Sequence, residues 1–215
     1  MKMMKKTKPI NELKIKRNSM DGLMEEREVH RDILVMLARE SFYVFVLLMG
    51  PLQVPGFKDG AHIKVICDAL QKAYETPDYR LMVNLPPGSS KSILCSVLYP
   101  AWILGKQPSW QILHIGHTAD FIAKFGGYIR DLLALPEYQE IFPDTKANEN
   151  FQARNGWETT RRGVYRSAGA GGAIAGKRGN IGICDDIVSE QNATSKAAME
   201  TIYEWWPGGF EGHHR

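Results

Sequence analysis

The sequence predicts an α/β fold in which helices flank a mostly parallel sheet, with a helical extension at the N-terminus. Short apolar runs such as "WQILHIGH" at 110–117 are typical of strands buried on both faces, as in parallel sheets. Longer segments with apolar residues at three-and-four spacing separate these runs, so strands and helices alternate along the chain. With 215 residues, of which 44% are hydrophobic, the chain is long enough for one domain with a sizeable core.

Two helices are expected before the first strand. Residues 24–49 favour a single N-terminal helix, because apolar side chains recur at helical spacing and no Gly or Pro interrupts them before Gly50. After a loop, the segment "AHIKVICDALQKAYE" at 61–75 again spaces its apolar residues along one helix face. A helical layer therefore precedes the sheet.

A strand and a third helix are expected on either side of a loop that contains two prolines. The run "RLMVNL" at 80–85 is short and apolar and ends at Pro86 and Pro87, which favours a strand buried in a parallel sheet. Residues 91–104 favour a helix, and Pro100 is expected to kink it or end it early.

The second half of the chain continues the alternation of strands and helices. Residues 110–117 favour a strand, residues 118–138 a helix with a weak point at Gly126 and Gly127, and residues 142–157 a polar connection. The last expected elements are a strand at 162–167, a glycine-rich loop at 168–180, a strand in "IGICDD" at 181–186 and a helix at 192–206.

The basic charge of the chain is concentrated at its N-terminus. Seven Lys and Arg residues against Glu12 give the first 17 residues a charge of +6, so the rest of the chain carries −3 of the total of +3. Residues 1–20 are therefore expected to form a basic, mobile arm, and residues 21–215 the folded domain.

Cysteine usage and hydropathy favour a reducing cytoplasm. Cys67, Cys95 and Cys184 are widely spaced and odd in number, which fits neither a disulfide framework nor a zinc site. The most apolar segment, "FYVFVLLMG" at 42–50, is far shorter than the roughly 18 residues that a membrane helix needs. No membrane partner is expected.

The segment "LPPGSSKS" has the residue types of a phosphate-binding loop. Backbone N–H groups after a strand can bind an anion, the following helix adds its dipole, and a lysine reaches the β- and γ-phosphates. Lys91 and Ser92 fit the lysine and the Mg²⁺-binding hydroxyl, although Leu85 and Ser90 stand where the usual motif has glycines. The alternative is that Ser89 or Ser90 only caps a helix after a Pro-Pro-Gly turn.

A nucleotide site also needs carboxylates at the end of a neighbouring strand, and "NIGICDD" provides two. Asp185 is expected to face the metal, and Asp186 to orient the attacking water. The alternatives are structural acids or a nuclease site, and the nuclease is disfavoured because adjacent residues of a strand point to opposite faces. Lys177 and Arg178 in the glycine-rich loop are either a source of positive charge for the transition state or a solvated pair.

In this order the motifs resemble the ATPase domain of large terminase subunits, the DNA-packaging motors of tailed bacteriophages. The resemblance runs from about residue 62 to residue 206. Its carriers are "HIKVICDAL", "NLPPGSSKS", "LYPAWILG", "ILHIGHTADFIAKFGGYIRDLL", "GAGGAIAGKRGNIGICDDIVSEQNATS" and "YEWW".

The resemblance implies an additional-strand P-loop NTPase fold that uses ATP and Mg²⁺ in the host cytoplasm. Its implied partners are double-stranded DNA, the portal protein, the small terminase subunit and further copies of the chain in a ring. Asp186 would be the catalytic acid and Arg178 the arginine supplied to a neighbour, and Asp185 would hold the metal. The nucleotide-binding residues would be Pro87, Gly88, Ser89, Ser90, Lys91 and Ser92, of which Ser92 also faces the metal.

The sequence also departs from that family. Large terminases continue into a strand that couples hydrolysis to movement and then into a nuclease domain, and neither follows "EWWPGGFEGHHR". Residues 21–215 are therefore expected to be an ATPase domain truncated at its C-terminal end. A helicase-like ATPase and a catalytically silent docking or oligomerisation fragment remain as alternatives.

Overall fold

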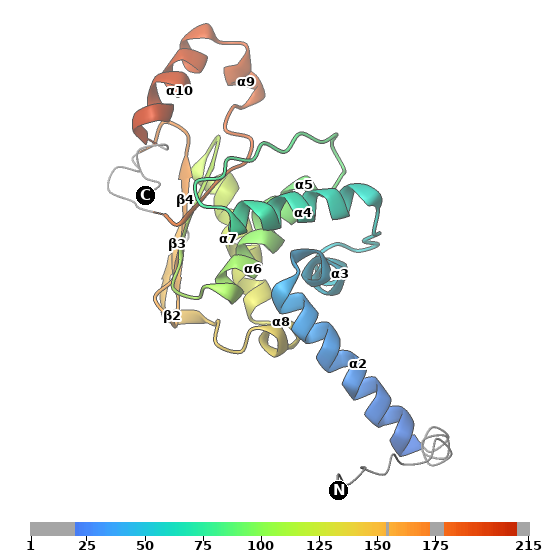
Figure 1. Ribbon diagram of the computed structural model, residues 1–215. Coiled ribbons are helices and arrows are strands. Elements are labelled where there is room, and N and C mark those ends of the chain that lie inside the picture. Colours follow the sequence, from blue (N-terminus) through green and yellow to red (C-terminus); the bar gives the residue numbers. More distant parts are fainter. Residues whose placement is uncertain (1–19, 154, 173–178, 210–215) are drawn as a thin grey trace, which may run out of the picture.

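The computed structural model describes residues 20–153, 155–172 and 179–209 and shows an α/β fold (Figure 1). Helices α3 to α8 cover one face of a mixed sheet, α10 lies on the other side of the strands, and α2 projects from the body. The basic arm predicted at residues 1–20 lies outside the described residues, except that Met20 begins α2. The coarse prediction of an α/β fold with a helix-flanked sheet is confirmed.

The described part of the chain contains a five-stranded sheet in the order β2-β3-β4-β1-β5. Strand β1 is parallel to both β4 and β5, whereas β2 and β3 form an antiparallel hairpin beside β4, so the sheet is mixed and not mostly parallel as predicted. The strands are β1 (Gln111–Gly116), β2 (Ala147–Ala153), β3 (Gly156–Thr159), β4 (Val164–Gly169) and β5 (Ile181–Cys184).

The prediction of a polar connection at residues 142–157 is wrong, because this stretch contains β2 and the start of β3. Strand β2 lies at the edge of the sheet, and its side chains are mostly exposed. An edge strand does not need the apolar pattern that identifies a buried strand, so the polar sequence of β2 did not predict a strand.

The single helix predicted at residues 24–49 is also wrong. Two helices, α2 (Met20–Glu40) and α3 (Phe42–Gln53), meet at Ser41 with a bend of 111°. Ser41 has an extended backbone, and its hydroxyl accepts a hydrogen bond from the Val44 N–H, so it begins α3 as an N-cap. Helix α4 (Ala61–Glu75) spans the residues predicted for it.

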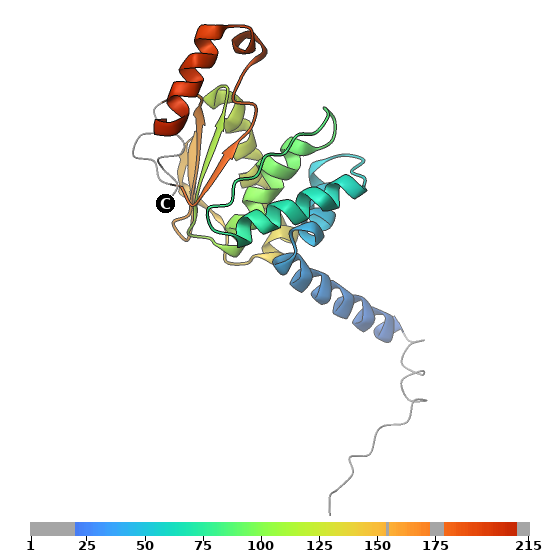
Figure 2. The ribbon, with the colours of Figure 1, turned by 45° about the horizontal axis from the view of Figure 1, so that its top comes forward.

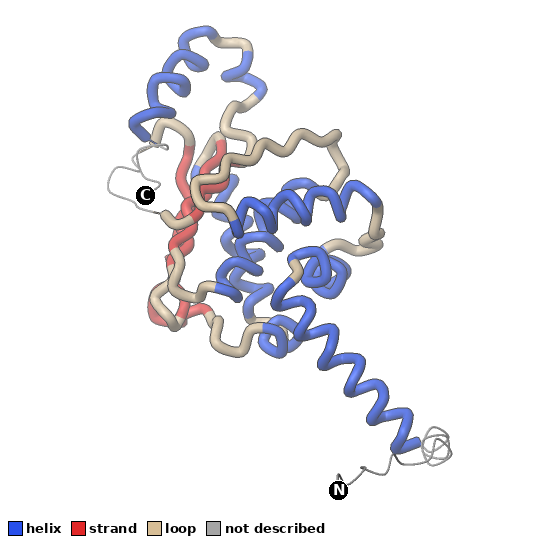
Figure 3. Tube along the Cα trace, viewed as in Figure 1, coloured by secondary structure: helices blue, strands red, loops and turns tan. Residues whose placement is uncertain are grey.

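The strand predicted at 80–85 is not formed: within the described residues this segment pairs with no strand, and Figure 3 shows it as loop. Its residues alternate in exposure, since Val83 and Leu85 pack against the core while Met82 is 84% exposed. The segment is apolar enough for a strand, but no strand among the described residues lies beside it to form a ladder. The sheet therefore ends at β5 in the described part of the chain.

The helix after this loop continues through Pro100 instead of ending there. It begins as α5 (Lys91–Ile93), widens into the π-helix η1 (Leu94–Leu98) and continues as α6 (Tyr99–Lys106). Pro100 has no N–H to donate, and the wider π-turn immediately before it changes the hydrogen-bond register. The remaining helices are α7 (Ala119–Leu133), α8 (Pro136–Ile141), α9 (Glu190–Ala193) and α10 (Lys196–Gly209).

The main core lies between the sheet and the helices on its inner face. Its largest fully buried side chains include Trp102, Tyr138, Tyr165 and Phe42. A smaller cluster on the outer face joins Leu113, Ile115 and Ala168 to Trp205 of α10, and Figure 2 shows α10 on that side of the strands. Among the described residues no single helix has the length and apolar character needed to cross a membrane.

Candidate nucleotide site

The loop between the 80–85 segment and α5 has a backbone that few residue types adopt easily. Gly88 has φ of +78°, and Ser90, which precedes the helix, has φ of +61°. The Ser89 hydroxyl donates to the Pro86 carbonyl at 2.7 Å, which closes a tight turn. Among the described residues Ser90 makes no side-chain capping hydrogen bond, so the helix-cap alternative does not explain this turn.

Two consecutive carboxylates follow β5 at the carboxyl end of the sheet. Asp185 is 5% exposed, and its N–H donates to the Ile115 carbonyl of β1 at 2.9 Å. Asp186 has φ of +47°, its side chain is 61% exposed, and its carbonyl accepts from the His117 N–H at 3.0 Å. The end of β1 thus fixes the backbone of both acids.

Lys91 faces both carboxylates across 94 and 95 positions of sequence. Its Nζ lies 3.6 Å from Asp185 Oδ1 and 3.5 Å from Asp186 Oδ1. Burial lowers the pKa of Lys91, but the two carboxylates outweigh burial and raise the pKa above its ordinary value. Lys91 is therefore a protonated ammonium at neutral pH.

The expectation that adjacent acids point to opposite faces does not hold here. Strand β5 ends at Cys184, and the left-handed backbone at Asp186 interrupts the alternation of side chains. Asp185 is buried and Asp186 is exposed, yet one oxygen of each approaches the same ammonium. The argument used against a nuclease site therefore loses its basis.

A serine that the sequence analysis did not select completes the surroundings of Asp185. The Ser96 hydroxyl is fully buried and donates to Asp185 Oδ2 at 2.9 Å. Ser96 follows Ser92 by four positions, the spacing that places two residues on one helix face. This spacing is the signal that could have identified it.

The residues at this site suit Mg²⁺ in the presence of a phosphate ligand. In the part of the chain that the structure describes, no group of three His, Cys, Asp or Glu side chains could hold a metal by itself. Mg²⁺ usually binds one or two carboxylates together with substrate phosphates and several waters. Asp185 is a carboxylate of this kind, and the half-buried Ser92 directly after Lys91 is the hydroxyl that the sequence analysis expects to join it.

The remaining residues that the sequence analysis selected are two basic residues of the glycine-rich loop and the turn before Lys91. Arg178 and Lys177 lie outside the described residues. Pro87, Gly88, Ser89 and Ser90 belong to the turn before Lys91 and are exposed or half-buried. The structure thus brings together the lysine loop and the acids but says nothing of the arginine.

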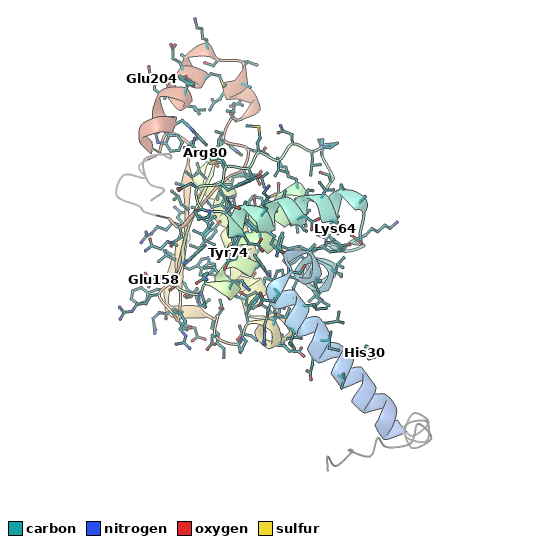
Figure 4. All side chains as sticks on the ribbon, in the orientation of Figure 1. His30, Lys64, Tyr74, Arg80, Glu158 and Glu204 are labelled. Carbon is teal, nitrogen blue, oxygen red and sulfur yellow. The ribbon has the colours of Figure 1, made fainter. Side chains whose placement is uncertain are left out.

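A groove of about 700 Å³ lies elsewhere, on the outer face of β2, β3 and β4. Glu158 is one of its lining residues, and Figure 4 shows this side chain on the side of the sheet away from α4, the helix that carries Lys64 and Tyr74. Lys91 and both acids are absent from its lining.

Comparison with protein-family models found no matching family, and comparison with curated proteins found no matching relative.

Proposed function

We propose that this chain is a Mg²⁺-dependent ATPase domain of the kind found in large terminase subunits, which hydrolyses ATP to drive double-stranded DNA into procapsids. One observation carries the proposal: the lysine that opens a helix after a Pro-Pro-Gly-Ser-Ser loop lies within 3.6 Å of two consecutive carboxylates at a strand end. Phosphate-loop ATPases combine a loop lysine that binds the β- and γ-phosphates with an acid that holds Mg²⁺, and these residues offer the same pair.

Lys91 supplies the phosphate-binding charge in this proposal. When ATP binds, the Lys91 ammonium leaves the oxygens of Asp185 and Asp186 and pairs with those of the β- and γ-phosphates. The two acids then no longer have a positive charge beside them. Asp185 and Ser92 are then free to hold Mg²⁺, which neutralises phosphate charge when bound.

Asp186 is the residue suited to activate water, because its carboxylate is exposed beside the buried Asp185. It accepts a hydrogen bond from the water whose oxygen attacks the γ-phosphorus while the bond from that phosphorus to the β-phosphate oxygen breaks. Arg178, from the same chain or a neighbouring copy, is proposed to stabilise the charge on the transferred phosphoryl group. DNA, the portal protein, the small terminase subunit and a ring of copies are the partners that this function implies.

The test is calorimetric binding of Mg·ATP to the wild-type chain and to Lys91→Ala. We expect the variant to bind about 10- to 100-fold more weakly, because it loses charge-assisted hydrogen bonds to phosphate. Lys64→Ala is the matched control, since the Lys64 ammonium pairs with Asp68 one helical turn away and lies over the Tyr43 ring, away from both site acids. Equal affinities of wild type and Lys91→Ala would refute the phosphate-loop assignment.

A second candidate, an oligomerisation module without turnover, is favoured by α2. The apolar residues Val29, Ile33 and Met36 of this projecting helix are 52%, 49% and 64% exposed, and they lie at helical spacing on one face. A second copy of the chain is the partner that such a module implies. ATP turnover by the pure chain that disappears in Asp186→Asn would exclude this candidate.

A further inference from the structure

The two carboxylate oxygens of Asp185 have different partners. Oδ1 faces the Lys91 ammonium at 3.6 Å, and Oδ2 accepts a hydrogen bond from the Ser96 hydroxyl at 2.9 Å. Ser96 is fully buried and Asp185 is 5% exposed, so neither group exchanges its partner freely with bulk water. The hydroxyl therefore fixes the plane of the carboxylate from the buried side.

We propose that Ser96 is a positioning residue for the Mg²⁺ site, which acts by holding Asp185 so that Oδ1 points toward the phosphate loop. This inference rests on the proposed function, because it assigns Ser96 a role at that same site. Hydrogen bonds from outside the ligand shell orient ligating carboxylates, and their loss commonly weakens metal binding by about 10- to 100-fold. Ser96 itself touches neither phosphate nor metal in this proposal.

The π-helix gives Ser96 its position. Ser96 is the central residue of η1, whose closing hydrogen bond runs from the Tyr99 N–H to the Leu94 carbonyl. A π-turn contains more residues per turn than an α-helix, so it rotates the residues that follow relative to those before it. Leu94, Val97 and Leu98 are fully buried, which anchors the turn in the core and leaves the Ser96 hydroxyl directed at β5.

The geometry also explains why a hydroxyl is needed at this position. A buried carboxylate without a hydrogen-bond donor is costly, and Ser96 supplies the donor to Oδ2 while the Lys91 ammonium faces Oδ1. Replacing Ser96 with Ala removes the donor and leaves the Asp185 carboxylate free to rotate toward Lys91. Rotation of this kind strengthens the lysine pair and withdraws Oδ1 from the metal.

The experiment measures binding of ADP by calorimetry, in Mg²⁺ and in EDTA, to the wild-type chain, Ser96→Ala and Ser96→Cys. We expect Ser96→Ala to lose about 10-fold of its affinity in Mg²⁺ and to match the wild type in EDTA. Ser96→Cys, which keeps the side-chain size and a weak donor, should fall between them. In an Asp185→Asn background, Ser96→Ala should have no further effect on the Mg²⁺ dependence.

Ser167→Ala is the matched control, because Ser167 is another buried serine whose hydroxyl donates elsewhere, to the Asn155 carbonyl at 3.3 Å. Wild-type affinity of Ser96→Ala in Mg²⁺, or an equal loss in Mg²⁺ and EDTA, overturns the positioning role. Failure of the wild-type chain itself to bind Mg·ADP refutes the proposed function, and the Ser96 assignment falls with it.

Discussion

His114 is a buried base whose charge state should control stability in acid. The ring is fully buried between Phe125 and Tyr165, and Nδ1 lies 2.8 Å from the Tyr165 hydroxyl. Among the described residues Nε2 has no hydrogen-bond partner, and burial lowers the pKa of His114 to about 3.

The sign of the pH effect follows from this lowered pKa. Between the unfolded value of 6.5 and about 3, the unfolded chain binds a proton that the folded chain does not. The stabilisation is present above pH 6.5 and is lost progressively as the pH falls, by about 2 kcal/mol at about pH 5. Urea unfolding at several pH values should therefore show a steeper loss for the wild type than for His114→Phe. Identical pH profiles would mean that folding does not lower the pKa of His114.

Within helix α7, substitution of two adjacent glycines by Ala should have opposite effects on the free energy of unfolding. A Cβ on Gly126 would lie 2.5 Å from the Tyr165 ring, whereas a Cβ on Gly127 would meet nothing within 4 Å. Gly126→Ala should destabilise the protein by about 1–3 kcal/mol, because Tyr165 is buried and cannot retreat. Gly127→Ala should stabilise it by about 0.5–1 kcal/mol through helix propensity.

Chemical unfolding of the two variants checks this prediction directly, since each serves as the control for the other. The sequence analysis treated both glycines as one weak point of the helix. A similar effect of both substitutions on the free energy of unfolding would show that helix propensity, not the approach of Tyr165, decides the outcome.

The sequence predicted correctly the elements whose formation depends on neighbouring residues, and it failed for those that depend on contacts with distant parts of the chain. Helix α4 was predicted residue for residue because its apolar face is encoded locally. The break at Ser41 was missed because the apolar pattern continues across it, and the cap is visible only when α3 turns into the core. The 80–85 segment was misassigned because pairing depends on a distant partner strand, which composition does not reveal.

The residues of the candidate site were likewise predicted only in part. Lys91 lies close to Asp185 and Asp186 although the strand expected before its loop is not formed, so only the acids follow a strand as expected. Their catalytic roles stay predictions. Ser96 was missed because a serine inside an apolar helix resembles any small core residue; its spacing from Ser92 is a weak signal, and its hydrogen bond to Asp185 is what identifies it.

At the scale of the whole molecule, the two faces of the sheet differ in how many apolar side chains pack against them. The inner face is packed against α3 to α8 in one large cluster, while the described cover of the outer face includes α10 through Trp205 and a small apolar cluster. Trp205 Nε1 also donates to the Gly172 carbonyl at 3.2 Å. Regions with few buried contacts open at lower free energy than the core, so α9 and α10 should form a separate unit of low stability.

Trp205→Ala tests this division of the molecule by amide hydrogen exchange. Loss of the ring removes apolar contacts with Leu113, Ile115 and Ala168, so exchange in residues 190–206 should accelerate by about 10-fold, equivalent to about 1.4 kcal/mol. Exchange in α7 should be unchanged, because its large buried residues belong to the inner cluster, which does not include Trp205. Tyr203→Ala is the control, since Tyr203 is on the same helix and 80% exposed. Faster exchange throughout the sheet in Trp205→Ala would instead show that the outer helix and the core unfold together.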